Sequence, residues 1–391
     1  MKGPASFLKH ASEVAMFYGF KPMQDIERAL PERALLSAAA RRKRIPLYSF
    51  GSAAQIAGAH AAARPGEPVM GFYATPAPMY LPTQTGILPA LNAREVGEFG
   101  LQVVGTNESV GEVVLIKTVA MIASEWGMKV TRVRLNAMGD RDSQNRFERE
   151  LALHARKHAA RLDSTCKDDA MKDPFTMYRC DKQTCHDVVS EAPRAMHFLS
   201  EKSRTHFRSV LEHVEQLGLA YELDDLLVGD ERGPHLAFAL DFEDPDVTLV
   251  GAVGGRYDEY LRRETRRKDS AGVGASLFFR KKGVTVSACQ PPSHKSYKPK
   301  VYFAQLGLRA KLQGLTVVDM LRAARVPVLQ SFDTAHLGNQ LATARELGVS
   351  HLLIMGQREA LDGTLIVRSM QNSAQTTLAL SDIPRFLKTL R

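Results

Sequence analysis

The chain has 391 residues and a formal net charge of +9, from 52 Lys and Arg against 43 Asp and Glu. Charged residues make up 24% and hydrophobic residues 44% of the sequence, which is ordinary for a soluble globular protein. No run of about 18 apolar residues occurs and no signal-peptide pattern opens the sequence, so we expect a cytosolic protein of two or three domains.

Four cysteines are present, Cys166, Cys180, Cys185 and Cys289, which are too few and too scattered for a disulfide framework. Cys180 and Cys185 are followed by His186, and together they resemble one corner of a metal site. A structural zinc site needs four ligands and usually a tighter Cys-x2-Cys spacing. We therefore expect free thiols and no bound metal.

Apolar residues at helical spacing predict a first helix over residues 7–20, which ends at Gly19. The following run, Tyr-Gly-Phe-Lys-Pro, starts a strand. The same periodicity predicts a strand at 130–135 and helices at 113–127, 143–161 and 202–217, whereas residues 163–182 are polar and are predicted to be looped. His206 and His213, on the last of these helices, are interpreted as surface residues.

A strand-like run over residues 247–250 is followed by two glycines and a charged turn: Gly254, Gly255, Arg256, Tyr257 and Asp258. Glycine lets the backbone turn and lets a ligand approach closely, because it has no Cβ. Arg256 and Asp258 can hold each other rigidly while Tyr257 faces a pocket. The stretch is therefore either a structural Arg-Asp clasp or part of a binding site.

The sequence Gly-Gly-Arg-Tyr-Asp, followed by a short helix and a leucine, resembles the second histidine-recognition motif of the histidyl-tRNA synthetases. These are class II enzymes built on an antiparallel sheet, and the resemblance extends over most of the chain. It implies an α+β class II synthetase-like core with a helical insertion at about 140–225. By analogy with that core, it also implies a homodimer.

Several positions that bind histidine in the family differ in this chain. The family run Leu-Arg-Pro-Glu-Gly-Thr-Ala reads Leu-Tyr-Ser-Phe-Gly-Ser-Ala. Gly51 and Ser52 fit, but Phe50 replaces the Glu that would hold the amino group of histidine. An ammonium needs an anionic or strongly polar partner in a closed pocket. Gln102 and Val114 replace two further carboxylates of the family.

The positions that handle ATP differ as well. No Arg or Lys lies between Arg64 and Arg94, where the second class II motif carries the Arg that grips the α-phosphate. The family run Arg-x-Phe-His-Gln-x-Gly matches only at Arg94 and Gly100, and the first histidine motif is reduced to a shifted Arg232. Arg280 falls where the adenine-stacking Arg of the third motif belongs. Phosphate displacement relies on a positioned cation, so catalysis is expected to be impaired.

A Pro-, Lys- and Ser-rich run at 291–300 predicts a linker between a core at 1–290 and a last domain at 301–391. Alternating patterns beyond it predict a compact α/β sheet domain. The predicted strands lie at 301–306, 326–330, 351–355, 365–370 and 376–380, and the helices at 307–325, 336–347 and from residue 382. The domain resembles the anticodon-binding domain of histidyl-, threonyl-, prolyl- and glycyl-tRNA synthetases.

Basic residues dominate from Arg262 to Lys300, where Glu264 and Asp269 are the only acids. This span is either a solvated basic face or a contact zone for phosphates. Amide and guanidinium donors of the last domain can read unstacked bases, and linker lysines can follow phosphates. The predicted RNA-binding residues are Asn339, Gln340, Arg368, Lys295, Lys298 and Lys300.

Three functions remain open. The first is a catalytically impaired synthetase relative that binds tRNA or another structured RNA and needs no cofactor. The second is an active, divergent histidine-tRNA ligase that uses ATP with Mg²⁺ and relies on Arg232 and Arg94. The third is the regulatory subunit of ATP phosphoribosyltransferase, against which the well-kept last domain counts. The predicted substrate pocket comprises Gly254, Gly255, Arg256, Tyr257, Asp258, Gly51, Ser52 and Gln102. Arg280 is the predicted contact to a nucleotide. No membrane or DNA partner is expected.

Overall fold

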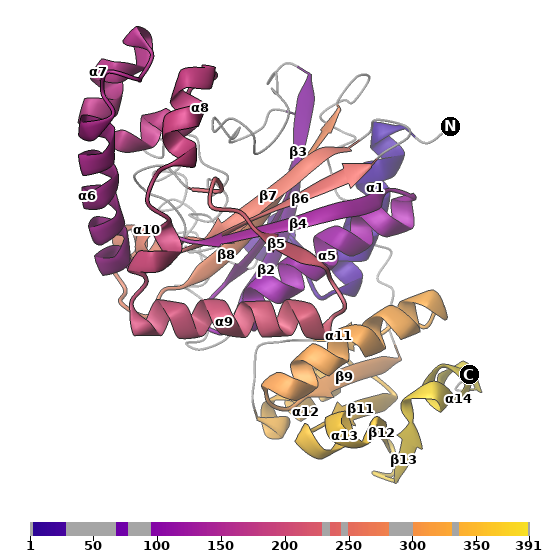
Figure 1. Cartoon of the computed structure of the whole chain (residues 1–391). Coiled ribbons are helices and arrows are strands. Elements are labelled where there is room, and N and C mark those ends of the chain that lie inside the picture. Colours follow the sequence, from indigo (N-terminus) through magenta and orange to yellow (C-terminus); the bar gives the residue numbers. More distant parts are fainter. Residues whose placement is uncertain are drawn as a thin grey trace.

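A computed structural model of the chain describes residues 3–28, 68–76, 95–228, 235–243, 249–280, 300–330 and 336–389. These residues form two sheets, one of eight strands and one of five, each accompanied by helices (Figure 1). No helix within the described ranges is long and apolar enough to cross a membrane.

The large sheet has the strand order β1-β2-β3-β8-β7-β6-β4-β5. Its strands are β1 (Lys21–Pro22), β2 (Val69–Thr75), β3 (Val96–Val104), β4 (Lys129–Ala137), β5 (Tyr221–Leu223), β6 (Leu236–Glu243), β7 (Leu249–Arg256) and β8 (Gly272–Arg280). The six strands from β2 to β4 pair antiparallel, whereas the short strands β1 and β5 run parallel to their neighbours at the two edges. The predicted antiparallel core is confirmed.

One face of this sheet packs against α1 (Pro4–Phe17) and α5 (Val110–Trp126), and α2 (Met23–Arg28) follows β1 at the edge. Phe99 and Leu101 of β3 belong to the hydrophobic core formed with these helices. Because side chains alternate along a strand, the residues between them face the other side of the sheet. That second face carries the polar side chains described below.

A helical insertion connects β4 to β5, and it is confirmed where the sequence predicts it. It contains α6 (Arg141–Lys157), α7 (Ser164–Lys172), η1 (Pro174–Arg179), α8 (Gln183–Ser190), η2 (Ala195–Phe198) and α9 (Glu201–Gln216). In Figure 1, α6, α7 and α8 stand together beside the sheet, and α9 runs along its lower edge.

The prediction of a loop over residues 163–182 is wrong, since α7 and η1 lie there. Two aspartates begin these elements. Asp163 accepts a hydrogen bond from the Thr165 backbone, and Asp173 accepts one from Phe175. Helix α7 buries only Cys166 and Ala170, so its apolar spacing is too sparse to be recognised from periodicity. The capping aspartates were the available signal.

The second sheet has the order β10-β9-β11-β12-β13 and confirms the predicted strand and helix alternation. Its elements are β9 (Val301–Gln305), α11 (Leu308–Ala323), β10 (Leu329–Gln330), α12 (Leu337–Glu346), β11 (His351–Met355), α13 (Gln357–Asp362), β12 (Thr364–Ser369), β13 (Gln375–Ala379), η4 (Leu380–Asp382) and α14 (Ile383–Thr389). Strands β10, β9 and β11 are parallel, and β12 and β13 complete the sheet antiparallel. Outside this second unit, helix α10 (Asp258–Thr265) connects β7 to β8 of the large sheet.

Helix α11 of the second unit lies against α5 and α1 of the first (Figure 1). The guanidinium of Arg322 binds Glu125 through two contacts of 2.5 and 2.8 Å and lies 5.2 Å from the centre of the Phe17 ring. Asp319 binds Lys117 at 2.6 Å and accepts a hydrogen bond from the Tyr18 hydroxyl. Of the predicted linker, only its last residue, number 300, is described, so the domain boundary stays a prediction.

Candidate functional site

Two polar side chains of β3 lie on the sheet face that points away from α1 and α5. Glu98 and Gln102 are both fully buried. The hydroxyls of Tyr73 and Ser276 donate hydrogen bonds to one oxygen of Glu98, at 2.5 and 2.6 Å. The hydroxyl of Tyr257 donates to the side-chain oxygen of Gln102. A line of hydrogen-bonded polar groups therefore crosses four strands or strand ends: β2, β3, β8 and the end of β7.

Glycines make room for these groups. A Cβ at Gly100 would collide with the ring of Tyr73, and a Cβ at Gly274 would collide with the amide of Gln102. Gly254, which the sequence placed in the pocket, serves packing instead, because a Cβ there would collide with the core ring of Phe238. Gly100 and Gly274 therefore leave the space on the sheet surface that the side chains of Tyr73 and Gln102 occupy.

Beside this line of polar groups, Arg256 at the end of β7 forms a buried ion-pair cluster with Glu112 of α5 and Asp258 of α10. The Arg256 side chain binds Glu112 through two contacts of 2.5 and 2.7 Å, and Asp258 at 3.2 Å. Its remaining bonds go to the carbonyl oxygens of Thr106 and Glu108, at 3.0 and 3.2 Å. These five contacts use every N–H group that a guanidinium has.

Burial and charge act in opposite directions on this cluster. Burial alone would disfavour the ionised form of Glu112, but the charge and hydrogen bonds of Arg256, with a smaller contribution from His206, hold its pKa at about 2. Burial also opposes the charge on Arg256, yet Glu112 and Asp258 together raise the pKa of its guanidinium. Both groups are therefore charged across the whole physiological pH range.

A pocket of about 110 Å³ opens next to the cluster and is lined by His206, His235, Asp258, Arg262 and Lys202, among others. The Nε2 atom of His206 lies 2.7 Å from Glu112. Burial lowers the pKa of His235, and its Nε2 is buried without a hydrogen-bond partner among the described residues. This atom is available to a ligand. The volume is small beside the roughly 300–1,000 Å³ of common ligand pockets.

A wider, basic groove adjoins this pocket and shares two of its residues. Its volume is about 500 Å³, and its lining residues are Lys202, Arg262, Arg266, Arg267 and Lys268. We call this surface the basic groove. It contains the start of the predicted phosphate-contact zone, and its cations come from α9, from α10 and from the segment that directly follows α10. Such a surface attracts a polyanion backbone or a phosphate.

The structure brings together the part of the predicted pocket that it describes. Gln102, Arg256, Tyr257 and Asp258 are buried around the same strand ends, and Gly255 pairs with Gly274 on the adjoining strand. The remaining predicted residues of the core and linker lie outside the described ranges: Gly51, Ser52, Arg94, Arg232, Lys295 and Lys298.

Arg280, the predicted nucleotide contact, stands at the end of β8. Its side chain is 48% exposed and lies 3.6 Å from Glu95, and its backbone pairs with Val96 of β3. A weakly held, exposed guanidinium can turn toward a ligand at little cost. In this respect Arg280 differs from the fully bonded Arg256.

In the second unit, Lys300 and Asn339 are exposed and Arg368 is half-buried. Gln340 requires a correction, because it is only 1% exposed. Its amide exchanges two hydrogen bonds of 3.0 Å with the backbone of Gln305. These bonds tie α12 to β9, so the side chain has a structural role and does not present donors to a base.

Sequence reasoning missed four polar residues of the site: Glu98, Glu112, His206 and His235. Glu112 is an acid inside an otherwise apolar helical run, which is a signal for a buried ion pair. Glu98 precedes Gln102 by four positions with a glycine between, which places both on one face of a strand. The interpretation of His213 as a surface residue is wrong, since it is buried and hydrogen-bonded to Ser109 at 3.0 Å. His206 is half-buried and lies 2.7 Å from Glu112.

Residues 301–390 match the family model described as "Anticodon binding domain". Most of the chain is similar to the histidine–tRNA ligase of Bacillus velezensis, with 25% identity over 329 residues that cover 83% of this chain and 76% of that protein. The corresponding ligase of Thermosynechococcus vestitus is 26% identical over 293 residues, covering 74% and 67% of the two chains. The chain is therefore related to the histidyl-tRNA synthetases.

Two solved structures are similar to this chain along most of the length of both chains. The apo histidyl-tRNA synthetase of Staphylococcus aureus covers 96% of this chain and 93% of its own, with 18% identity and a TM-score of 0.45. A Bacillus halodurans protein titled as an ATP phosphoribosyltransferase regulatory subunit/histidyl-tRNA synthetase covers 90% and 94%, with 13% identity and a TM-score of 0.38.

Proposed function

We propose that this histidyl-tRNA synthetase homologue binds tRNA or another structured RNA and is impaired in activating histidine with ATP. The observation that carries the proposal is that all five N–H groups of the Arg256 guanidinium are already hydrogen-bonded within the protein. Adenylation needs a positioned cation on the phosphate that is displaced. The buried arginine beside the pocket has no N–H group left for that task.

Arg280, the predicted nucleotide contact, does not replace it. Arg280 is exposed at the end of β8 and beside Glu95, which suits a contact to a base or sugar better than a closed phosphate grip. The segment that would carry the family's phosphate-gripping Arg contains no Arg or Lys between Arg64 and Arg94. Catalysis would have to use Arg94 or Arg232, at positions shifted from the family pattern.

The RNA-binding half of the proposal is supported by two separate surfaces. The matched anticodon-binding domain supplies the exposed Asn339 and the half-buried Arg368, and the exposed Lys300 directly precedes it. The basic groove gives the core a second cationic surface, next to the pocket where an RNA end would arrive. Two contact regions on one chain raise affinity through effective concentration. We also infer a homodimer, by analogy with class II synthetases.

An active, divergent ligase is the second candidate, and Glu98 is the observation that favours it. The family motif has Gln where Glu98 stands, and a carboxylate where Gln102 stands, so the two side chains are exchanged along one face of β3. A buried carboxylate therefore still lies on the sheet face that could receive an ammonium group.

Two measurements on the purified, full chain test the proposal. One is histidine-dependent ATP–pyrophosphate exchange, for which we expect no activity above the background without histidine. The other is a gel-shift titration with total tRNA at two salt concentrations, for which we expect binding that weakens as salt rises. Histidine-dependent exchange overturns the impaired half, and the absence of any salt-sensitive tRNA complex overturns the RNA-binding half.

A further inference from the structure

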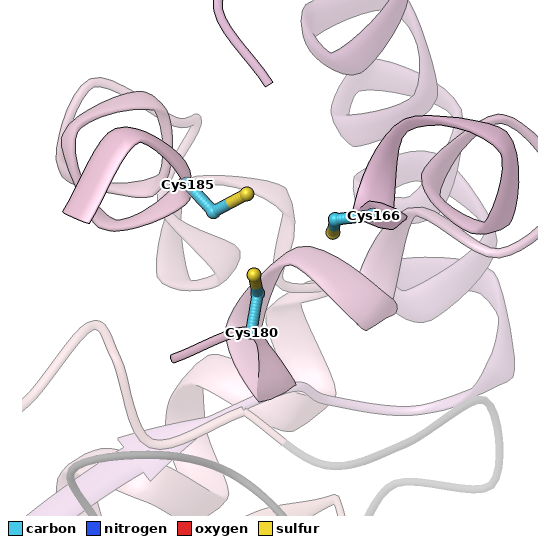
Figure 2. A group of neighbouring side chains, drawn as sticks. All are labelled: Cys166, Cys180 and Cys185. Carbon is cyan, nitrogen blue, oxygen red and sulfur yellow. The ribbon is translucent and has the colours of Figure 1, made fainter. Parts of the chain in front are cut away.

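Three cysteines of the helical insertion converge on one point. Cys166 lies in the first turn of α7, Cys180 directly follows η1, and Cys185 lies in the first turn of α8. Their sulfur atoms all lie within 4.8 Å of one another. Figure 2 shows the three side chains pointing toward a common centre from three separate elements. Sequence spacing alone did not reveal this, because Cys166 is distant from the other two.

We propose that Cys166, Cys180 and Cys185 bind one zinc ion through their thiolates and that this ion ties the helical insertion together. The proposal is independent of the function proposed above, since the cluster lies in the core of the insertion and contributes nothing to the pocket beside Arg256.

The geometry suits a tetrahedral thiolate site. Zinc–sulfur bonds of about 2.3 Å place neighbouring sulfurs about 3.8 Å apart, so the three thiols need to move by only a fraction of an ångström to surround an ion. Sites with three protein ligands complete their coordination with a water molecule. Cys180 is half-exposed, and it gives the cluster a side from which an ion and a water can enter.

The surroundings favour thiolates once a cation is present. The backbone N–H of Lys182 donates a hydrogen bond to the thiol of Cys180, which favours its ionised form. Cys166 and Cys185 are each the third residue of their helices, where the positive end of the helix dipole stabilises an anion.

Without a cation, the same three groups oppose one another. Burial, followed by the neighbouring thiols, raises the pKa of Cys166 to about 12, and burial also raises the pKa of Cys180. The thiols of Cys166 and Cys180 are therefore protonated at neutral pH in the metal-free chain. Binding of Zn²⁺ replaces three S–H bonds by three Zn–S bonds and releases three protons to solvent.

A metal ion would stabilise the insertion, whose own helices and core are small. Its elements α7, η1 and α8 have 9, 6 and 8 residues, which is too short for stable isolated helices in water. Their core is a small cluster, separate from the core of the large sheet, and includes Phe147, Phe175 and the cysteines themselves. Small cores of this kind commonly depend on a metal or a disulfide. Buried cysteines often act only as small apolar side chains, but that role does not require three sulfurs to meet.

The test is the metal content of the full chain, purified under reducing conditions without chelator. We expect about one zinc per chain by mass spectrometry. We also expect the metal-free chain to take up one equivalent of Co²⁺, with the thiolate charge-transfer and intense visible bands of a tetrahedral site. Cys166→Ser, Cys180→Ser and Cys185→Ser should each remove stoichiometric metal, whereas the matched control Cys289→Ser should keep it.

The cobalt titration uses the unaltered chain, so its result does not depend on whether a serine variant folds. Far-ultraviolet circular dichroism identifies any variant that fails to fold. Three results would overturn the proposal. They are a reduced wild-type chain that holds no zinc and gives no thiolate–cobalt bands, a folded triple-serine variant that keeps its zinc, and a disulfide between two of the three cysteines in the freshly purified protein.

Discussion

Arg256 of β7 and Glu112 of α5 form a bidentate ion pair in which both side chains are almost wholly removed from water, with exposures of 2% and 0%. The pair joins the sheet to the helix that covers it, from the end of the Gly-Gly-Arg-Tyr-Asp stretch. Two readings of that stretch were open, a clasp and a ligand pocket. The contacts of Arg256 make it a clasp at this residue, while Asp258 still borders the small pocket beside it.

Removing one partner of this pair should destabilise the folded chain. We expect Glu112→Gln to lower the free energy of unfolding by about 3–5 kcal/mol, because it leaves a buried guanidinium without its counter-charge. Urea unfolding followed by circular dichroism measures this difference. The control is Glu95→Gln, which removes the exposed partner of Arg280 and should cost less than about 1 kcal/mol. Equal, small effects of both substitutions would show that the clasp contributes little.

The ion pair between Arg256 and Glu112 should also make the free energy of unfolding depend on pH in the acid range. The pKa of Glu112 is about 2 in the folded chain against an ordinary value of 4.5, so the carboxylate contributes stability at every pH above its unfolded pKa. That contribution falls as the pH drops from 4.5 toward 2, because the folded state then has to take up a proton that the unfolded state already holds. Unfolding curves from neutral pH down to about pH 3 should therefore converge for the wild type and Glu112→Gln. Curves that stay equally far apart would contradict the assigned pKa.

The contact of α11 with α5 and α1 should weaken when Arg322 is replaced. We expect Arg322→Ala to lower the free energy of unfolding by about 1–2 kcal/mol, because it loses a bidentate pair with Glu125 and the contact with the Phe17 ring. Thermal unfolding should then separate into two less cooperative steps. Arg358→Ala serves as the control, since its pair with Asp362 is exposed. Matching transitions in both variants would indicate that α11 does not couple the two units.

The basic groove should carry part of the RNA affinity. Charge reversal at Arg266 and Lys268, two of its exposed cations, should weaken tRNA binding and flatten its salt dependence by roughly one unit of logarithmic slope per lost phosphate contact. Lys172→Glu, an exposed cation on α7, is the matched control and should leave the slope unchanged. If both changes alter the slope equally, the groove has no special role.

The sequence allowed the fold to be predicted in most of its elements. The alternation in the last domain and the long helices α5, α6 and α9 carry strong periodic patterns, so their prediction succeeded. The failure at residues 163–182 has a clear cause: α7 and η1 are short and polar outside and begin at capping aspartates. A search for Asp163 and Asp173 as helix starts would have found them.

The site was harder to predict because its polar groups come from segments that are far apart in the sequence. A single sequence does not show which of these segments lie together in the fold. Glu112 lies 144 positions from Arg256, and no local pattern connects them. Gln340 was assigned to RNA because its type suits base recognition, yet its amide is occupied by a neighbouring strand. Residue type predicts what a side chain can bind, whereas burial decides whether it is available.

Histidine-dependent ATP–pyrophosphate exchange tests the central claim most directly, because it isolates the first half-reaction from any effect of tRNA. An active histidine-tRNA ligase assayed in parallel sets the scale. We predict that the purified chain stays at the background measured without histidine, because Arg256, the buried cation beside the pocket, has no N–H group left for the displaced phosphate. Exchange that depends on histidine would contradict the account, and loss of that exchange in Arg232→Ala or Arg94→Ala would then identify the replacement cation.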